Sequence, residues 1–374
     1  MASTQFMVER PSYWKRIKPY VTVFDGPLML LMILILSVST FTMYSAGYDF
    51  DGRIDGHLRN IAIALGIMWV AANMPPQALM RVAMPIYTVG VALLIAVAMF
   101  GLIRKGARRW LDIGVVIQPS EIMKIALPLM LAWYFQKREA GLRWQEYAVA
   151  ALLVAIPFTL IAKQPDLGTG LLVGASGFFV IFFAGFSWKI MLALGAAAMA
   201  AMPVIWSMLH DYQRMRVMTL IDPTVDPLGK GFHIIQSMIA IGSGGVAGKG
   251  WRNGTQAHLE FIPERTTDFL FAVYSEEFGL VGNCVLLVLY LLVIGRGLYI
   301  AANAPTIFTR LLAAALTMMF FTYAFVNMGM VSGILPVVGV PLPFMSYGGT
   351  AFVTLGLGIG MLMTIQRHRK LMQS

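Results

Sequence analysis

Ten long apolar runs, separated by polar stretches, dominate this 374-residue sequence. They fall at about 28–48, 60–74, 82–102, 120–136, 146–163, 167–186, 190–209, 269–295, 309–331 and 349–366. A membrane-spanning helix needs roughly 20 predominantly apolar residues. Because lipid offers backbone groups no hydrogen-bonding partners, and no ten-residue alternation indicates a barrel, helices are the expected spanning structures. The sequence therefore predicts an all-α, polytopic integral membrane protein with about ten transmembrane helices.

The scarcity of charge supports this fold class. Charged residues make up 12% of the chain, against about 25% in soluble proteins, and the mean hydropathy is +0.74. The net charge of +10 is large for so few charged groups. Attraction to anionic membrane lipids explains it more simply than nucleic acid does, so no nucleic-acid partner is expected. We expect residues 1–374 to form a single membrane domain.

The distribution of basic residues predicts the orientation. With the N-terminus in the cytoplasm, the inner segments hold about half of the 28 basic residues, and the short outer loops hold about half as many. Long loops cross regardless of charge, so the loop at about 210–267 can lie outside. Both termini are therefore expected in the cytoplasm. Within the long loop, residues 232–241 are typical of a short amphipathic helix near the membrane interface.

A pair of opposite charges opens the fourth predicted span. Pro119 suits the first turn of a helix, and Glu121 and Lys124 are three residues apart, so they share a helix face and can pair. An ionisable residue at membrane depth costs about 2.5–3.5 kcal/mol on insertion scales. The pair is either a structural ion pair at a helix start or part of the polar lining of a substrate cavity.

The basic stretch 104–110 lies just before that pair and includes Arg108 and Arg109. A short outer loop usually avoids such a cluster. Lipid head groups could attract it, and so could a phosphate-bearing substrate, because Arg and Lys suit phosphate oxygens.

Asp268 stands where the long loop enters the eighth predicted span. Thr266 or Thr267 could cap that helix, with Asp268 in its first turn beside the positive end of the helix dipole. Alternatively, burial at the lip of an apolar bundle would make Asp268 a usable general base. Glu276 and Glu277 would then lie two turns deeper in the same helix.

Two irregular stretches are expected at the outer face. Residues 332–349 contain Pro336, Pro341 and Pro343, and such backbone is tolerated at a membrane only where protein covers it or it lines a cavity. The tight turn around Asp166 joins the fifth and sixth spans, and Asp166 is expected to be a turn or cap residue rather than a catalyst.

Several motifs resemble the SEDS family (shape, elongation, division and sporulation). The motifs lie at 211–214, 226–229, 236–237, 241–245, 263–269, 333–343 and 346–349. They occur in the family's order, within a similarity that runs from about residue 15 to the C-terminus. Residues 254–256 and 259–261 are more similar to the elongation branch of the family than to the division branch.

The resemblance implies a peptidoglycan glycosyltransferase that polymerises lipid II during cell elongation and maintains rod shape. It implies a multi-pass protein of the bacterial inner membrane whose active site and long loop face the periplasm. The essential aspartate of the family matches Asp268, and its polar cavity residues match Glu121 and Lys124. A basic residue that opens the second span matches Arg59 less securely. The implied partners are the nascent glycan strand, membrane lipids and a class B penicillin-binding protein, a transpeptidase.

An inverting mechanism follows as a hypothesis. Lipid II carries its sugar on pyrophosphate in α linkage, and the product strand is β-1,4 linked, so one in-line displacement that releases undecaprenyl pyrophosphate suffices. Asp268 would be the base for the attacking hydroxyl. The cations that bind the leaving pyrophosphate would come from Arg108, Arg109, Lys124 and Arg59. A divalent cation, Mg²⁺ or Mn²⁺, could assist there.

Two other classes of function remain open at this point. A lipid II flippase or transporter predicts charged groups near the middle of the membrane on several spans. A non-catalytic scaffold of the elongation machinery predicts that Asp268 has no effect on chemistry. The clustering of charge toward the outer face favours the enzyme.

Overall fold

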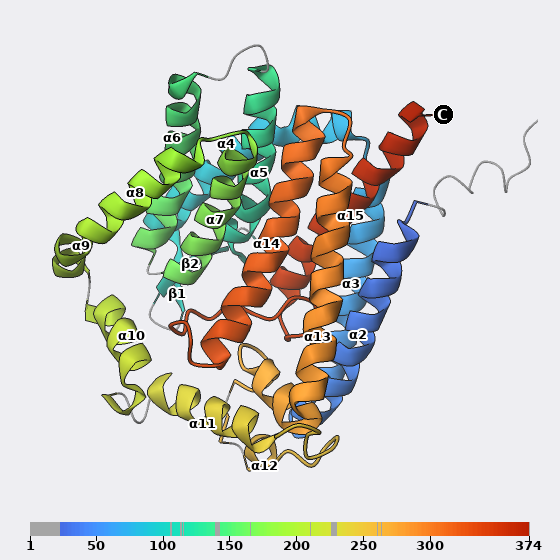
Figure 1. Ribbon diagram of the computed structural model, residues 1–374, viewed down its shortest axis with the longest axis vertical. Coiled ribbons are helices and arrows are strands. Elements are labelled where there is room, and N and C mark those ends of the chain that lie inside the picture. The colour runs from blue at the N-terminus through green and yellow to red at the C-terminus, as the bar shows by residue number, and fades with distance from the viewer. Residues whose placement is uncertain are drawn as a thin grey trace, which may run out of the picture.

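The computed structural model describes residues 23–104, 107–112, 114, 116–138, 143–164, 166–209, 211–225, 230–259, 261–262 and 264–373. Most of these residues form helices that run side by side as a bundle (Figure 1). The helices of the bundle are α2 (Gly26–Ala46), α3 (Arg53–Asn73), α4 (Pro76–Phe100), α5 (Pro119–Lys137), α6 (Trp144–Lys163), α7 (Leu167–Phe183), α13 (Leu270–Ala302), α14 (Ile307–Val331) and α15 (Gly349–Gln373). Two further helices, α8 (Trp188–Ala200) and α9 (Met202–Met208), extend obliquely from its side (Figure 1), and α8 buries no residue.

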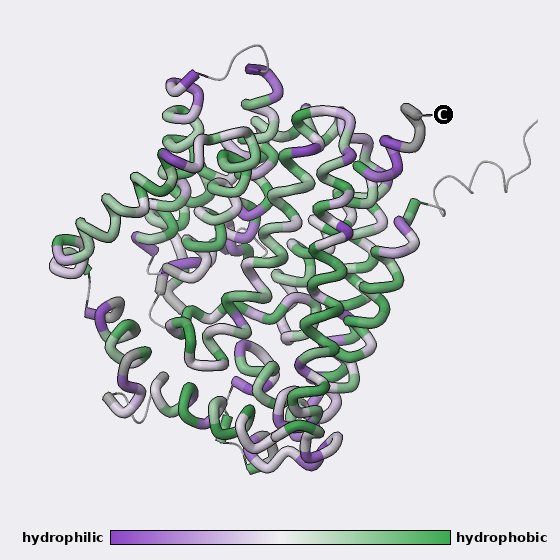
Figure 2. The backbone as a smooth tube through the Cα atoms, viewed as in Figure 1, coloured by the Kyte–Doolittle hydropathy of each residue, from purple (hydrophilic) through white to green (hydrophobic). Residues whose placement is uncertain are grey.

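Every predicted span falls on one of these helices, with α8 and the bent continuation α9 sharing one. Among the described residues, six helices are individually long and apolar enough to cross a membrane, or seven if the bent pair is one span. The chain is thus a multi-pass membrane protein, and the count of ten stays a prediction. Figure 2 shows hydrophobic residues along the helices and hydrophilic ones gathered toward the two ends of the bundle.

The helices alternate in direction between two ends. At one end, Arg296 near the end of α13 pairs with Asp25 before α2 at 2.6 Å. At the same end the side-chain oxygen of Gln136 accepts from the backbone N–H of Phe308 at 2.9 Å. The start of α2 and the end of α15 point toward this side of the bundle (Figure 1), and the prediction that both termini are cytoplasmic stays a prediction because residues 1–22 lie outside the described residues. We call the opposite end, with the 101–118, 164–166, 210–267 and 332–348 connections, the loop end.

The long connection at the loop end is helical. It contains α10 (Asp211–Ile221), the 3-10 turn η1 (Pro223–Val225), α11 (Lys230–Ser243) and α12 (Thr255–His258). The predicted amphipathic helix 232–241 is α11, which buries Ile234, Ser237 and Ala240 at three-residue spacing. The Ser237 hydroxyl donates to the carbonyl of Val331 at 2.9 Å and so fixes α11 against α14.

Two features were not predicted. The basic connection after α4 contains a small antiparallel sheet of β1 (Leu102–Arg104), β2 (Ala107–Asp112) and β3 (Val116–Ile117), in an otherwise helical fold. The predicted span 269–295 is also not one straight helix, because α13 bends sharply at Gly279, where φ is 62°.

Contacts across the bend are too close for a continuous helix. The Tyr274 hydroxyl donates to the carbonyl of Gly282 at 2.8 Å, and the Ser275 hydroxyl donates to Asn283 at 2.9 Å. Residues eight apart in a straight helix are about 12 Å apart along its axis. The segment 270–278 and the span that begins at Leu280 are therefore folded toward each other.

Gly279→Ala should destabilise the protein. A Cβ at Gly279 would lie 2.3 Å from the backbone nitrogen of Gly248, and the positive φ strains any side chain. We expect the free energy of unfolding to fall by about 1–3 kcal/mol. Gly295→Ala is the matched control in α13, because nothing lies within 4 Å of its Cβ. Thermal unfolding in detergent measures both, and equal midpoints for the two variants would contradict the bend.

Candidate functional site

Lys124 is the hub of a polar cluster inside the bundle. Lys124 is 3% exposed, and its ammonium lies 2.6 Å from Glu121 Oε1 and 2.5 Å from the hydroxyl of Tyr323. The other carboxylate oxygen of Glu121 accepts from the Thr354 hydroxyl at 3.1 Å. The predicted pair is thus confirmed, with Pro119 at the first turn of α5. The cluster joins α5, α14 and α15. Its polar groups serve as charge and hydrogen-bond partners for one another, because ionisable groups at membrane depth are costly without partners.

Asp268 lies in the turn before α13, where it is partly buried. Asn327 of α14 donates its amide to the backbone carbonyl of Asp268 at 2.8 Å and to that of Val340 at 2.7 Å. The predicted capping roles are wrong, because α13 begins at Leu270 after an N-cap at Phe269 that makes no side-chain cap. The Thr267 hydroxyl instead donates to Glu264 at 2.7 Å. Asp268 is therefore held by its backbone.

One face of α14 links the two groups. Tyr323, which reaches Lys124, and Asn327, which holds Asp268, are four residues apart, about 6 Å along the helix. Side chains at that spacing lie on the same face. The structure therefore brings Asp268 and the Glu121–Lys124 pair to one region of the bundle, as the sequence predicts. A substrate cavity between them stays a prediction.

The irregular 332–348 loop forms part of the same region. A Cβ on Gly339, whose φ is 72°, would lie 3.2 Å from Asp268 Oδ2, so the loop backbone passes beside the carboxylate. The preceding residue, Val338, contacts the start of α7, because a Cβ on Gly168 would lie 2.5 Å from the carbonyl oxygen of Val338. The loop thus connects the surroundings of Asp268 to the turn at Asp166.

Asp166 caps α7, as predicted, by accepting from the backbone N–H of Thr169 at 3.2 Å. Asp166 also contacts the strands β1 and β2, here called the basic hairpin, because Arg109 Nε of β2 lies 3.7 Å from Asp166 Oδ2. Gln118 donates to the same oxygen at 3.4 Å. Arg109 is therefore anchored close to the loop beside Asp268. Its neighbour Arg108 is exposed and donates to the carbonyl of Ala98 on α4 at 3.2 Å.

Arg59 is exposed on α3, nearly two turns after the helix starts. The residue that opens α3 is Arg53, whose guanidinium lies over the Tyr347 ring at 4.4 Å. The backbone N–H of Tyr347 in turn donates to the carbonyl of Thr266, two residues before Asp268, at 2.8 Å. Sequence reasoning missed Arg53, although its place just before the apolar run 60–74 was an available signal.

Arg265 was also missed, and it is one of the most buried side chains at 1% exposure. It pairs with Asp49 and donates to the carbonyl of Ala46 at 2.9 Å. The segment that carries Asp268 is therefore fastened to the end of α2. A buried guanidinium needs partners of this kind to offset its lost hydration.

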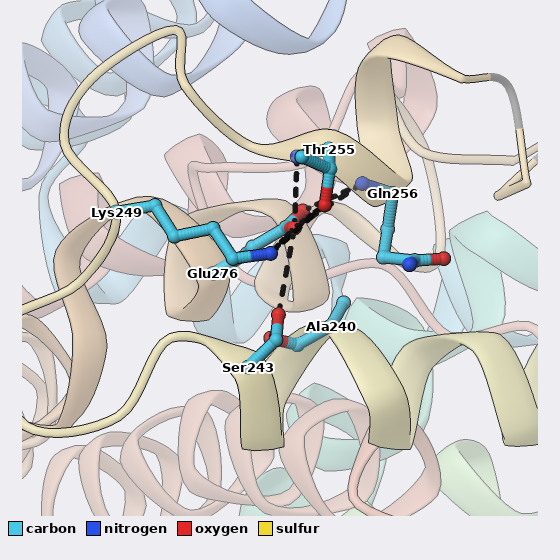
Figure 3. A network of polar contacts seen from close by, with 6 residues as sticks. All are labelled: Ala240, Ser243, Lys249, Thr255, Gln256 and Glu276. Atoms are coloured by element: carbon cyan, nitrogen blue, oxygen red, sulfur yellow. Dashed lines mark hydrogen bonds and ion pairs between the residues drawn. The ribbon is translucent and has the colours of Figure 1, made fainter.

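The predicted depth of Glu276 and Glu277 is wrong, because the bend at Gly279 turns them back toward the loop end. Both carboxylates are buried, and Glu276 Oε1 accepts from Lys249 Nζ at 2.6 Å and from the backbone N–H of Thr255 at 2.9 Å. Figure 3 shows these side chains meeting around Glu276. The two acids therefore anchor the long connection and do not extend the Asp268 site.

Among the described residues, no group of three or more His, Cys, Asp or Glu side chains is placed to hold a metal ion. A role for Mg²⁺ or Mn²⁺ stays a prediction.

Lys124→Met should destabilise the protein strongly, because it leaves the Glu121 carboxylate in the bundle without its cation. Breaking a buried pair from one side costs about 3–5 kcal/mol, and removing both charges costs less. The double variant Lys124→Met/Glu121→Gln should therefore unfold at a higher temperature than the single variant. Lys189→Met, at an exposed lysine of α8, is the control. A single variant as stable as the unaltered protein would contradict a buried pair.

Comparison with known proteins gives a consistent result. The model of the FtsW/RodA/SpoVE cell cycle protein family matches residues 20–371. The chain is 48% identical to the peptidoglycan glycosyltransferase MrdB of Escherichia coli K12 over 97% of both chains. It is 32% identical to the stage V sporulation protein E of Bacillus subtilis, over 92% of this chain and 98% of that protein.

Solved structures share the fold. A chain of a peptidoglycan synthase complex that coordinates polymerization and crosslinking superposes with a TM-score of 0.80 at 33% identity, covering 92% of this chain and 98% of that one. The rod shape determining protein RodA of Thermus thermophilus superposes with a TM-score of 0.70 at 27% identity, covering 92% and 97%. With a family model that spans nearly all of the sequence, the chain belongs to the FtsW/RodA/SpoVE family, the SEDS family that its motifs indicate.

Proposed function

We propose that this protein is a peptidoglycan glycosyltransferase that polymerises lipid II into β-1,4-linked glycan strands during cell elongation. Relatives that match almost the whole chain carry the name peptidoglycan glycosyltransferase. The proposal rests on α14, where Tyr323 contacts Lys124 and Asn327, one turn away on the same face, contacts the backbone of Asp268. A carboxylate and a fixed cation in one region of the bundle supply the two charges that transfer of a sugar from a pyrophosphate needs.

The proposed reaction is a single in-line displacement. The 4-hydroxyl of the acceptor sugar attacks the anomeric carbon of the donor, and the carbon–oxygen bond to the lipid-linked pyrophosphate breaks. Asp268 takes the proton of the hydroxyl, and the configuration inverts from α to β. The amide of Asn327 holds the backbone of Asp268 in place, and the loop at Gly339 passes beside the carboxylate that acts as the base.

The cationic side of the site faces the leaving undecaprenyl pyrophosphate. Lys124 is fixed by Glu121 and Tyr323, so its ammonium is preorganised and needs no reorientation when negative charge develops. Arg109 is the hairpin guanidinium closest to the Asp268 loop through its contact with Asp166. Arg108 and Arg59, both exposed, are assigned to capture of the same anion.

We place the site at the periplasmic face of the bacterial inner membrane. The basic hairpin, the 332–348 loop and the 210–267 connection all lie at the loop end of the bundle. Charge counting assigns the other end to the cytoplasm, where Arg296, Arg310 and Arg367 lie. Lipid II then reaches the site from the outer leaflet.

We further propose that the protein works with a class B penicillin-binding protein. A similar chain occurs in a peptidoglycan synthase complex in which polymerization and crosslinking are coordinated. A transpeptidase that crosslinks the emerging strand fits that arrangement.

Asp268→Asn should lower the rate of polymerisation by a factor of about 10²–10⁴, because an amide cannot accept the proton. Purified protein with labelled lipid II, read as glycan chain length on a gel, measures this. Asp211→Asn is the matched control, since Asp211 is a fully exposed carboxylate on α10. A folded Asp268→Asn protein that polymerises at the unaltered rate would remove the base and leave a flippase or a scaffold as the function.

Arg109→Ala should raise the KM for lipid II about tenfold, because a charge-assisted contact to the pyrophosphate is lost. Arg109→Lys should recover part of this loss by keeping the charge without the fork of donors. Arg214→Ala, at a half-exposed arginine of α10, is the control. A KM that the alanine variant leaves unchanged would exclude Arg109 from substrate binding.

A further inference from the structure

An apolar groove separates α2 from the part of α13 that follows the Gly279 bend. Its volume is about 660 Å³. Neither Asp268 nor Lys124 lines the groove, and its lining residues include Leu34, Phe41, Val285, Leu289, Trp251 and Phe278.

The groove opens toward the lipid. Leu34, Phe41 and Val285 are 42%, 61% and 51% exposed, although all three belong to membrane-spanning helices. Apolar side chains that are exposed on such helices contact hydrocarbon. In a membrane the groove is therefore filled by hydrocarbon. The residues at its loop end determine which lipid provides that hydrocarbon chain.

Aromatic residues and one cation form the mouth of the groove at the loop end. Trp251 stacks on Tyr44 with 5.8 Å between ring centroids and donates its indole N–H to the carbonyl of Phe41 at 3.0 Å. The guanidinium of Arg252 lies 5.7 Å from the Tyr44 ring and 6.0 Å from the Trp251 ring. Trp and Tyr are enriched at the level of lipid head groups, which places Arg252 at the depth of the phosphates.

Two buried acids hold this mouth rigidly. Glu276 binds Lys249 and Thr255, the two ends of the turn 249–255, as Figure 3 shows. Glu277 accepts from the backbone N–H of Arg252 at 3.1 Å, although Arg252 has an unfavourable φ of 63°. A strained residue persists only where its surroundings fix it. Because Lys249 is already paired with Glu276, Arg252 is the cation of the turn that faces outward.

We propose that this groove binds one phospholipid with a net negative head group, its hydrocarbon chain between α2 and α13 and its phosphate on Arg252. The cation of Lys249 is paired with Glu276, so the exposed guanidinium of Arg252 is the group of the turn 249–255 that is complementary to an anionic head group. A zwitterionic lipid brings its own ammonium and gains less from the same arginine. The site is independent of the proposed reaction, since neither Arg252 nor the groove contacts Asp268 or Lys124 in the contacts described.

The test uses the purified full-length protein in nanodiscs of phosphatidylglycerol and phosphatidylcholine in equal parts. Native mass spectrometry after mild detergent release counts the lipid that stays bound. Arg252→Ala removes the cation, and alanine meets the same positive φ as arginine at this position. Ser37→Phe fills the groove from an exposed position of α2. The controls are Arg310→Ala at the opposite end and Thr88→Phe on the exposed face of α4.

We expect one retained phosphatidylglycerol in the unaltered protein and both controls. Retention should fall about fivefold in Arg252→Ala, as the loss of one basic residue near a membrane surface predicts. It should also fall in Ser37→Phe. Equal retention in all variants, no preference for phosphatidylglycerol over phosphatidylcholine, or displacement of the lipid by added undecaprenyl phosphate would overturn the proposal. The last outcome would assign the groove to a polyprenyl chain. Polymerisation of lipid II is measured on the same samples. Because the lipid site is independent of the proposed reaction, a change in lipid retention without a change in polymerisation concerns this proposal alone.

Discussion

The buried ammonium of Lys124 is the constraint on which the centre of this bundle depends. Its partners come from two helices, Glu121 on α5 and Tyr323 on α14, and Glu121 reaches Thr354 on α15. In an apolar interior such a cation has no alternative partner, so the three helices must meet in one arrangement. The same arrangement fixes the face of α14 that carries Asn327, and through it the backbone of Asp268. The interaction that organises the bundle thus also positions the proposed base.

Local spacing explains what could be predicted from the sequence. Pro119, Glu121 and Lys124 lie within one turn and a half of helix, and the cap at Asp166 is equally local, so both were predicted correctly. Helix positions followed from the length of the apolar runs, because lipid leaves the backbone little choice. The amphipathic spacing of α11 was also readable.

What failed depended on contacts between distant segments. The run 269–295 is apolar on both sides of Glu276 and Glu277, so it was interpreted as one straight span, and the bend at Gly279 depends on residues 246–248, which pack against it. That error moved Glu276 and Glu277 to the wrong depth. By contrast, Tyr323 and Asn327 gave an unused signal: two polar side chains four residues apart in an apolar run share one face and indicate a polar partner there. Strands β1 and β3, which flank β2, are too short for an alternation pattern to predict.

The bend at Gly279 makes the segment 270–278 a short rod, about 13 Å long, with a different attachment at each end. At one end the carboxylates of Glu276 and Glu277 accept hydrogen bonds from the backbone of the surface turn 249–255. At the other end the backbone carbonyl of Asp268 accepts a hydrogen bond from the amide of Asn327. The turn at the surface and the backbone of Asp268 are therefore attached to opposite ends of one short helix. The length of that helix sets the spacing between the two attachments.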